Sequence, residues 1–127
     1  MTKDRYGGTM SSMKSDFAYL AGLLDGEGYF GIIPHHVTEN SYRPAIKLAS
    51  VSEGIILWLQ ASFGGYTHKR KMNGNRKTAF DWTLYDKASL KIILREIMPF
   101  LRIKKAQAEL LLLYVKQSSY KNLRSKN

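Results

Sequence analysis

The stretch LAGLLDGEG, Leu20–Gly28, combines two features that ordinarily weaken a helix. Its apolar residues have helical spacing, but Gly22 and Gly26 each cost roughly 1 kcal/mol relative to alanine in a helix interior. The stretch also ends with the acids Asp25 and Glu27, although the C-terminal end of a helix is already negative and favours cations. Both costs require compensating interactions elsewhere in the molecule.

Small residues recur at a spacing of four along this helix, at Ala18, Gly22 and Gly26. Residues four apart lie on one face of a helix, and a face without side-chain bulk lets another backbone approach closely. Two interpretations follow from the spacing. In the first, two copies of the helix pack against each other along this stripe. In the second, the stripe packs against the sheet of its own chain.

The two acids leave a similar choice. A divalent cation would offset the unfavourable position of Asp25 and Glu27, because hard cations such as Mg²⁺ bind carboxylate oxygens together with water and substrate phosphates. Alternatively, Asp25 caps a turn through hydrogen bonds and Glu27 is a solvated surface acid.

The composition favours a polyanionic partner. The chain has 20 Lys and Arg against 10 Asp and Glu, which gives a formal net charge of +10 on 127 residues. An excess of this size is typical of proteins that bind nucleic acid. The absence of cysteine excludes disulfides and cysteine-ligated zinc. We also expect a soluble intracellular protein, because the first residues lack the apolar core of a signal peptide and the run Leu110–Val115 is too short to span a bilayer.

Apolar spacing and turn signals predict an α+β domain built on antiparallel strand pairs. We expect residues 1–14 to form a mobile arm, residues 15–120 a single domain and residues 121–127 a basic tail. Ser15 or Asp16 is the expected cap of the first helix, and Asn73-Gly74 is a tight-turn signal between the third and fourth strands. After the first helix we expect two strands, a helix, two strands and two helices, over residues 29–36, 43–51, 52–63, 66–71, 76–85, 86–98 and 104–120.

Alternation along the predicted strands separates two faces of the sheet. One face carries apolar residues that can cover the helices: Phe30, Ile32, Ile46, Leu48, Phe80, Trp82 and Leu84. The other face carries Tyr29, Gly31, Ile33, His35, Arg43, Ala45, Lys47, His68, Arg70, Lys77, Asp81 and Thr83. A twisted antiparallel sheet can lie in the major groove of DNA, where base edges present a distinguishable code. Given the net charge of +10, the second face is the candidate surface for nucleic acid.

The stretch Leu20–Gly28 resembles the signature motif of the LAGLIDADG homing endonucleases at every position, if Glu27 stands for the second acid and Gly26 for the small residue before it. The predicted order of elements resembles that family's αββαββαα unit over residues 15–120. The segment PFLRIKKAQAELLLL, Pro99–Leu113, is similar to the closing segment of the family. The resemblance implies a curved antiparallel sheet that forms a DNA-binding saddle.

A single copy of the motif is present, and single-motif chains of that family act as homodimers. The resemblance therefore implies a dimer axis at the first helix, with Ala18, Gly22, Asp25 and Gly26 at the interface. Such a dimer would bind a long, roughly palindromic site in double-stranded DNA.

The resemblance also implies metal-assisted hydrolysis of phosphodiester bonds, with Mg²⁺ or Mn²⁺ as the ion. Glu27 matches the metal-binding acid, with Gly26 beside it at the metal. Lys104 matches the basic residue that supports the active-site pocket. A polar residue at the end of the second strand is expected near the reacting water, and Ser52 holds that position, with Ser50 or Glu53 as alternatives.

Two other functions are compatible with the same fold. One is an RNA-binding maturase that assists intron splicing without cutting DNA, and the other is a DNA-binding protein whose catalysis has decayed. The presence of both Glu27 and Lys104 favours the enzyme. We expect it in a bacterial, archaeal or organellar compartment that contains its target DNA.

Overall fold

The computed structural model describes residues 10–34, 41–71, 74 and 77–125. The expected order of elements and the α+β class are confirmed. The elements are α1 (Met10–Glu27), β1 (Gly28–Pro34), β2 (Tyr42–Ser50), α2 (Glu53–Phe63), β3 (Tyr66–Lys69), β4 (Phe80–Leu84), α3 (Lys87–Ile97), the 3₁₀ turn η1 (Met98–Phe100) and α4 (Lys105–Ser125).

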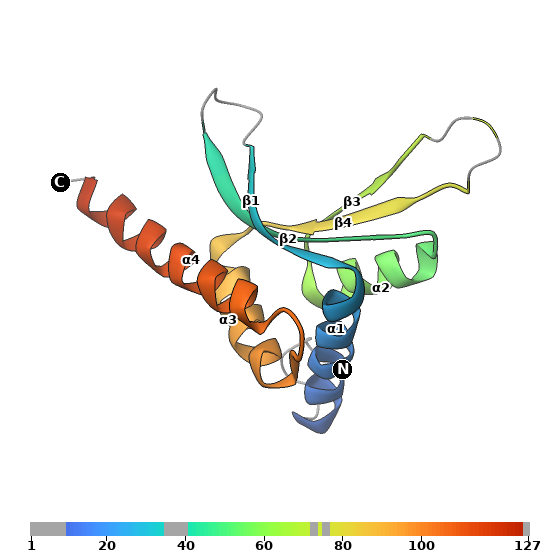
Figure 1. Ribbon diagram of the computed structural model, residues 1–127, viewed down its shortest axis with the longest axis horizontal. Coiled ribbons are helices and arrows are strands. Elements are labelled where there is room, and N and C mark those ends of the chain that lie inside the picture. The colour runs from blue at the N-terminus through green and yellow to red at the C-terminus, as the bar shows by residue number, and fades with distance from the viewer. Residues whose placement is uncertain (1–9, 35–40, 72–73, 75–76, 126–127) are drawn as a thin grey trace.

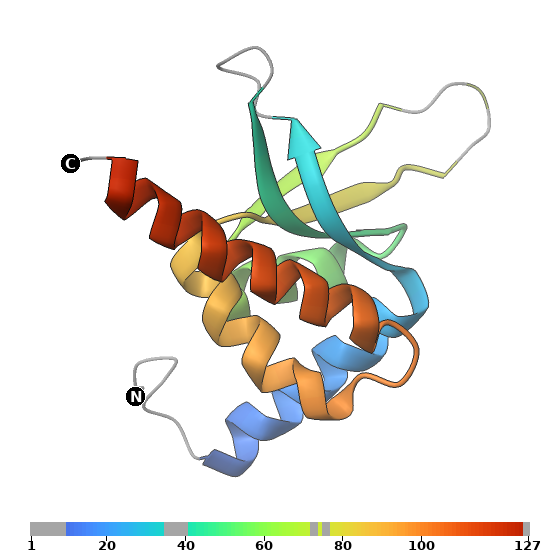
Figure 2. The same cartoon turned by 60° about the vertical axis from the view of Figure 1, so that its left-hand side comes forward.

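The four strands form one antiparallel sheet in the order β1-β2-β4-β3. The helices lie on one side of this sheet, and the two hairpins curve away from its centre on the other side (Figure 1). The sheet is therefore a saddle with one covered and one open face. In the turned view α3 and α4 lie alongside each other beneath the strands (Figure 2).

One apolar core fills the space between the sheet and the helices, and no polar or charged side chain of the described residues is buried. Helix α3 shows why the helices form as predicted, because four of its apolar residues recur at helical spacing and face this core: Leu90, Ile93, Leu94 and Ile97. Trp82 is completely buried, and its Nε1 donates a hydrogen bond to the carbonyl oxygen of Gly64 at 2.8 Å. No helix in the part of the chain that is described is long and apolar enough to cross a membrane.

The corner between α2 and β3 requires glycine. Gly65 has a φ of +97°, in the region that residues with a side chain rarely adopt. A Cβ at this position would lie 2.7 Å from the carbonyl oxygen of Thr83 and 2.8 Å from Nε1 of Trp82. The close approach of this corner to β4 therefore depends on the absence of a side chain.

Several element ends differ from the prediction. Helix α1 begins at Met10, so the expected cap at Ser15 or Asp16 is wrong and residues 10–14 are helical. The physical reason is that residues 10–14 contain no glycine or proline to stop the helix. Helix α4 likewise continues to Ser125, through residues that we expected in the basic tail.

The second hairpin is shorter than predicted. Strand β3 ends at Lys69, and strand β4 begins at Phe80. The backbone N–H of Arg70 donates a hydrogen bond of 2.8 Å to the carbonyl oxygen of Ala79, which extends the pairing of the two strands by one step. Gly74 has a φ of +69°, as a turn glycine commonly does, whereas Asn73 lies outside the described residues. Residues 1–9, residues 35–40, which include His35, and residues 126–127 also lie outside the described residues.

Candidate functional site

The acid Asp25 is bound by the segment that leads into α4. Its Oδ2 accepts the backbone N–H of Arg102 at 2.7 Å, and its Oδ1 accepts those of Ile103 and Lys104 at 3.0 and 2.9 Å. Unpaired N–H groups before a helix favour a negative partner. The acid at the end of one helix therefore caps the start of another. Of the two interpretations of Asp25, capping is the one that the structure shows.

These hydrogen bonds also decide the charge of Asp25. Partial burial raises the pKa of its carboxyl group, but the backbone N–H groups of Arg102, Lys104 and Ile103 lower the pKa by more, and the charge of Lys104 lowers it further. The resulting pKa lies below the ordinary value of an aspartate, so Asp25 is ionised at neutral pH.

Lys104 reaches the residue that follows the second acid. Its Nζ donates a hydrogen bond of 2.7 Å to the carbonyl oxygen of Gly28, and its side chain is half-buried. A Cβ on Gly28 would lie 2.7 Å from the Cα of Leu24, so glycine allows the tight passage from α1 into β1. The structure therefore places the ammonium group of Lys104 beside the end of α1.

Glu27, the last residue of α1, has an exposed side chain. Its carboxylate has no hydrogen-bond or ion-pair partner among the described residues. It borders a hollow of about 440 Å³ that is lined by Leu23, Glu27, Leu48, Ala49, Ser50, Val51, Ile55 and Ala79. An unpartnered carboxylate thus faces open space between the end of α1 and the end of β2.

The two serines at the end of β2 have different surroundings. Ser50 lines the hollow with Glu27, and its Oγ accepts the backbone N–H of Ser52 at 3.0 Å. Ser52 is the N-cap of α2, where its Oγ accepts the backbone N–H of Ile55 at 3.4 Å. Glu53 follows in the first turn of α2. The hollow therefore brings together Glu27 and Ser50, and it does not include the expected Ser52.

The described residues contain no group of three or more histidine and acidic side chains that could hold a metal ion without other ligands. The site offers the carboxylate of Glu27 and the exposed backbone at Gly26. A hard cation such as Mg²⁺ commonly takes one or two carboxylates and completes its shell with water and phosphate. The unpartnered Glu27 fits an ion of this kind.

The small-residue stripe on α1 is uncovered. Gly22 and Gly26 are exposed. Apart from the adjacent residues and the backbone of the same helix, no described atom lies within 4 Å of a Cβ built at either position. The other side of the helix fills the core with Phe17, Leu20 and Leu24. The stripe therefore does not pack against the sheet of its own chain, which removes the second interpretation of its spacing.

The strand register places the predicted polar residues on one face of the sheet. Residues directly opposite in an antiparallel pair share a face, and a single row runs across all four strands through Tyr29, Lys47, Thr83 and Tyr66. Neighbouring rows on the same face pair Gly31 with Ala45, Ile33 with Arg43, and Ala49 with Asp81 and His68. Among the other predicted residues, Lys77 is exposed but precedes β4, and His35 lies outside the described residues.

Three of the predicted contacts form a cluster on β3 and β4. Arg70 donates two hydrogen bonds to Asp81, from Nη2 to Oδ1 at 2.7 Å and from Nε to Oδ2 at 2.9 Å. Nδ1 of His68 lies 3.6 Å from the Asp81 carboxylate. Burial raises the pKa of Asp81, but the hydrogen bonds and charge of Arg70, together with His68 and Lys47, lower it by more, so the net shift is downward. Asp81 therefore orients Arg70 on the open face of the sheet.

Two tyrosines on this face were missed by the sequence prediction. The rings of Tyr66 and Tyr85 stack with centroids 5.0 Å apart and an interplanar angle of 13°. The guanidinium carbon of Arg43 lies 4.0 Å from the centroid of the Tyr85 ring. Strand alternation could have identified both, because Tyr66 lies two residues before His68 and Tyr85 two residues after Thr83.

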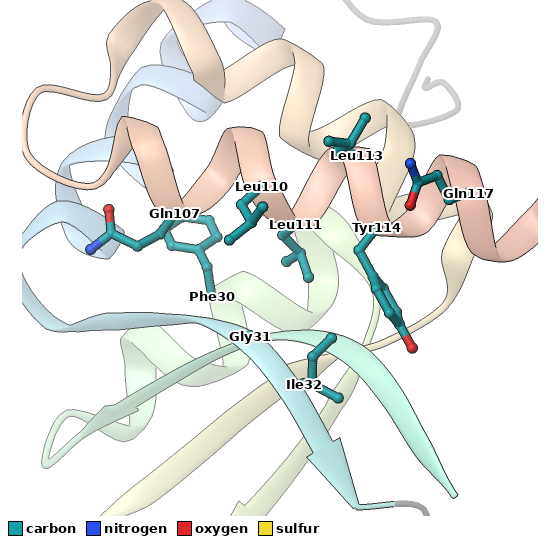
Figure 3. Close-up of a pocket in the computed structure, with 9 residues that line it drawn as sticks. All are labelled: Phe30, Gly31, Ile32, Gln107, Leu110, Leu111, Leu113, Tyr114 and Gln117. Atoms are coloured by element: carbon teal, nitrogen blue, oxygen red, sulfur yellow. The ribbon is translucent and has the colours of Figure 1, made fainter.

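A second hollow, of about 380 Å³, lies between β1 and α4 (Figure 3). Most of its lining is apolar: Phe30, Gly31, Ile32, Gln107, Leu110, Leu111, Leu113, Tyr114 and Gln117. It contains no titratable group except the phenol of Tyr114. We therefore place the candidate active site at Glu27 and not here.

No protein-family model and no curated protein sequence matches the chain. Solved structures do match it. The chain is similar to the homing endonuclease I-CvuI in complex with its target, with a TM-score of 0.68 and 26% identity over 84% of this chain and 69% of that one. It is also similar to I-Vdi141I, an archaeal intron-encoded homing endonuclease complexed with DNA, with a TM-score of 0.63 and 14% identity over 80% of this chain and 67% of that one.

A third similar structure is the LAGLIDADG meganuclease I-CpaMI bound to uncleaved DNA. The TM-score is 0.65 and the identity 18%, over 84% of this chain and 39% of that one. The chain thus spans about two-thirds of the first two proteins and less than half of the third. These similarities confirm the predicted fold.

Proposed function

Because the chain has the fold of the LAGLIDADG homing endonucleases and carries their motif at the end of α1, we propose that it is a DNA-binding nuclease. More specifically, we propose a homodimer that binds a long pseudo-palindromic duplex and hydrolyses its phosphodiester bonds with Mg²⁺ or Mn²⁺. The observation that best supports this function is the unpartnered carboxylate of Glu27, at the end of a helix whose small-residue stripe is uncovered.

The uncovered stripe supports the dimer. Two copies of α1 can approach closely along Ala18, Gly22 and Gly26, because no described side chain occupies that side of the glycines. Packing of this kind would bring the C-terminal ends of both helices together. Each protomer would then contribute one Glu27 to a shared centre, with one hollow for each strand of the duplex.

The open face of the sheet supports DNA as the substrate. It carries Arg43, Lys47, His68 and Arg70 on a chain with a net charge of +10, and the helices leave it uncovered (Figure 1). Basic side chains bind phosphates, which fix the orientation of the duplex, while groups that reach base edges determine the sequence. Tyr29, Gly31 and Ile33 line the part of this face that β1 contributes.

Each residue of the site has a distinct role in the proposed reaction. A divalent cation, when bound, activates water and stabilises the charge that develops on the phosphate. Glu27 would hold the cation, with Gly26 beside it, and the Ser50 hydroxyl in the same hollow can orient water by hydrogen bonding. Lys104 fixes the turn after Glu27 and adds positive charge near the phosphate.

The substitution Glu27→Gln tests the proposal. The variant keeps the shape of the side chain and removes its charge, so we expect it to fold, dimerise and bind a duplex selected from a randomised palindromic library. Cleavage should fall below detection, because the amide is a poor ligand for a hard cation. The matched control is Glu109→Gln, which changes an exposed acid on α4 and should cleave like the wild type.

Wild-type cleavage should stop in chelator and return with added Mg²⁺. A wild-type protein that binds a selected duplex tightly but nicks it with neither Mg²⁺ nor Mn²⁺ would refute the endonuclease and leave DNA binding without catalysis. A Glu27→Gln variant that cleaves at the wild-type rate would show that Glu27 does not hold the metal.

A further inference from the structure

Arg43 is held on the open face of the sheet by an aromatic ring. Its guanidinium carbon lies 4.0 Å from the centroid of the Tyr85 ring, a distance at which the cation is attracted to the ring. Its Nε is buried and has no hydrogen-bond partner within the described part of the chain. Buried donors are normally paired, so this unpaired nitrogen indicates a side chain whose position is determined by stacking.

The other arginine on this face is used differently. Arg70 commits its Nε and Nη2 to Asp81. Arg43 makes no hydrogen bond to any described residue, so both of its terminal nitrogens, Nη1 and Nη2, remain available. A guanidinium edge with two free N–H groups matches two adjacent acceptors, which a single ammonium group cannot do.

Tyr85 is itself fixed from a third strand. It follows β4 directly, and its ring stacks on Tyr66 of β3 with centroids 5.0 Å apart. The stack thus connects β2, β4 and β3 through Arg43, Tyr85 and Tyr66. Since an aromatic ring restricts the orientation of a guanidinium plane above it, the free edge of Arg43 has a defined direction before any ligand binds.

We propose that Arg43 reads a guanine in the outer part of each half-site and that Tyr85 is the residue that positions it. This inference rests on the proposed DNA binding by the open face of the sheet. Guanine presents O6 and N7 side by side in the major groove, and paired contacts from arginine to these atoms are the commonest specific contact to DNA. A phosphate can also accept two N–H groups of an arginine, but that contact would carry no base preference.

The position of the guanine follows from strand geometry. Arg43 precedes Ser50, which lines the hollow beside Glu27, by seven residues along β2. Seven residues of extended strand span about 23 Å, and base pairs are spaced by about 3.4 Å along the duplex. The guanine should therefore lie on the order of seven base pairs outward from the position opposite Ser50.

The test measures base preference at every position of the site. The wild type and its variants are incubated with a randomised palindromic library, and the bound duplexes are sequenced. We expect the wild type to prefer guanine by roughly 5- to 150-fold at one outer position. Tyr85→Leu should reduce this preference by about fivefold and leave the other positions unchanged. Arg43→Lys should reduce it as well.

Two control variants separate positioning from general effects. Tyr85→Phe keeps the ring and should keep the preference. Tyr42→Leu makes the same change as Tyr85→Leu one residue from Arg43, but on the opposite face of β2, and should behave like the wild type. Circular dichroism checks that each variant is folded, and Arg43→Lys tests the same contact without altering the aromatic stack.

The possible outcomes distinguish this inference from the proposed function. If the wild type selects no duplex, DNA binding fails and the inference fails with it. If the wild type selects a site but Tyr85→Leu retains the full guanine preference, the positioning role is refuted while DNA binding stands. If Arg43→Lys leaves the guanine preference intact, the paired guanidinium contact is refuted. If Arg43→Ala weakens binding equally for all sequences, Arg43 contacts phosphate and the inference is refuted.

Discussion

Asp25 and Glu27 lie two residues apart, yet one carboxylate accepts three backbone N–H groups and the other has no partner among the described residues. The donors to Asp25 lie 77 to 79 residues further along the chain. The sequence could therefore raise capping as one possibility, but it could not show where the donors come from.

The substitution Asp25→Asn should destabilise the protein by about 1 kcal/mol at pH 7, because a neutral amide loses the charged hydrogen bonds to the start of α4. The pKa of Asp25 is lowered in the folded state, so its contribution is present above the pKa of the unfolded chain and disappears as the pH falls through the folded value. Urea unfolding at pH 7 and pH 3, at equal protein concentration, measures this difference.

The control for this residue is Asp16→Asn, which changes an acid on the same helix. The stability difference between wild type and Asp25→Asn should shrink at pH 3, whereas that for Asp16→Asn should be small at both values. A deficit for Asp25→Asn that is the same at both pH values would show that the carboxylate charge contributes nothing to the cap.

Local sequence identified some site residues and not others for a physical reason. Glu27 and Lys104 belong to contiguous motifs that can be recognised without knowing the fold. The choice between Ser50 and Ser52 depends on the residue at which α2 begins, and Ser52 is used as its cap. Because the Ser52 side chain is used for this cap, the polar residue of the hollow is Ser50, two residues earlier.

Among the elements, the corner between α2 and β3 is the most sensitive to a single methyl group. Gly65→Ala should cost about 2 kcal/mol or more, because it combines a φ of +97° with a Cβ 2.7 Å from the carbonyl oxygen of Thr83. Gly54→Ala in α2 should instead stabilise the protein by about 0.5 to 1 kcal/mol, since nothing lies within 4 Å of its Cβ. Thermal unfolding should show a lower melting temperature for Gly65→Ala and a higher one for Gly54→Ala. An unchanged melting temperature for Gly65→Ala would contradict the prediction.

The strands were more predictable than the ends of the helices. Their two-residue alternation assigns each side chain to a face, and the register of β1, β2 and β4 agrees with that assignment. Helix ends depend on weak signals, and residues 10–14 were assigned to an arm although the helix includes them. The stack of Tyr66, Tyr85 and Arg43 was missed because it depends on contacts between three strands.

For the whole molecule, the central prediction is that two chains meet along α1. Gly22→Leu should shift the protein from dimer to monomer, because overpacking typically costs about 1 to 3 kcal/mol and no described residue of its own chain crowds a Cβ at this position within 4 Å. Sedimentation measures the shift, and Ala88→Leu, an exposed position on α3, is the control that should remain dimeric. A wild type that stays monomeric at high concentration would refute the dimer.

The hydrogen bonds of Asp25 also have a consequence for the synthesis of the chain. Helix α1 leaves the ribosome many residues before Arg102, Ile103 and Lys104 have been made. During that interval the acid motif is complete in sequence, but Asp25 lacks its donors and Lys104 cannot yet hold the carbonyl of Gly28. A chain interrupted before Arg102 therefore contains the motif without the contacts that order its end, so this site can take its final form only after Lys104 has been made.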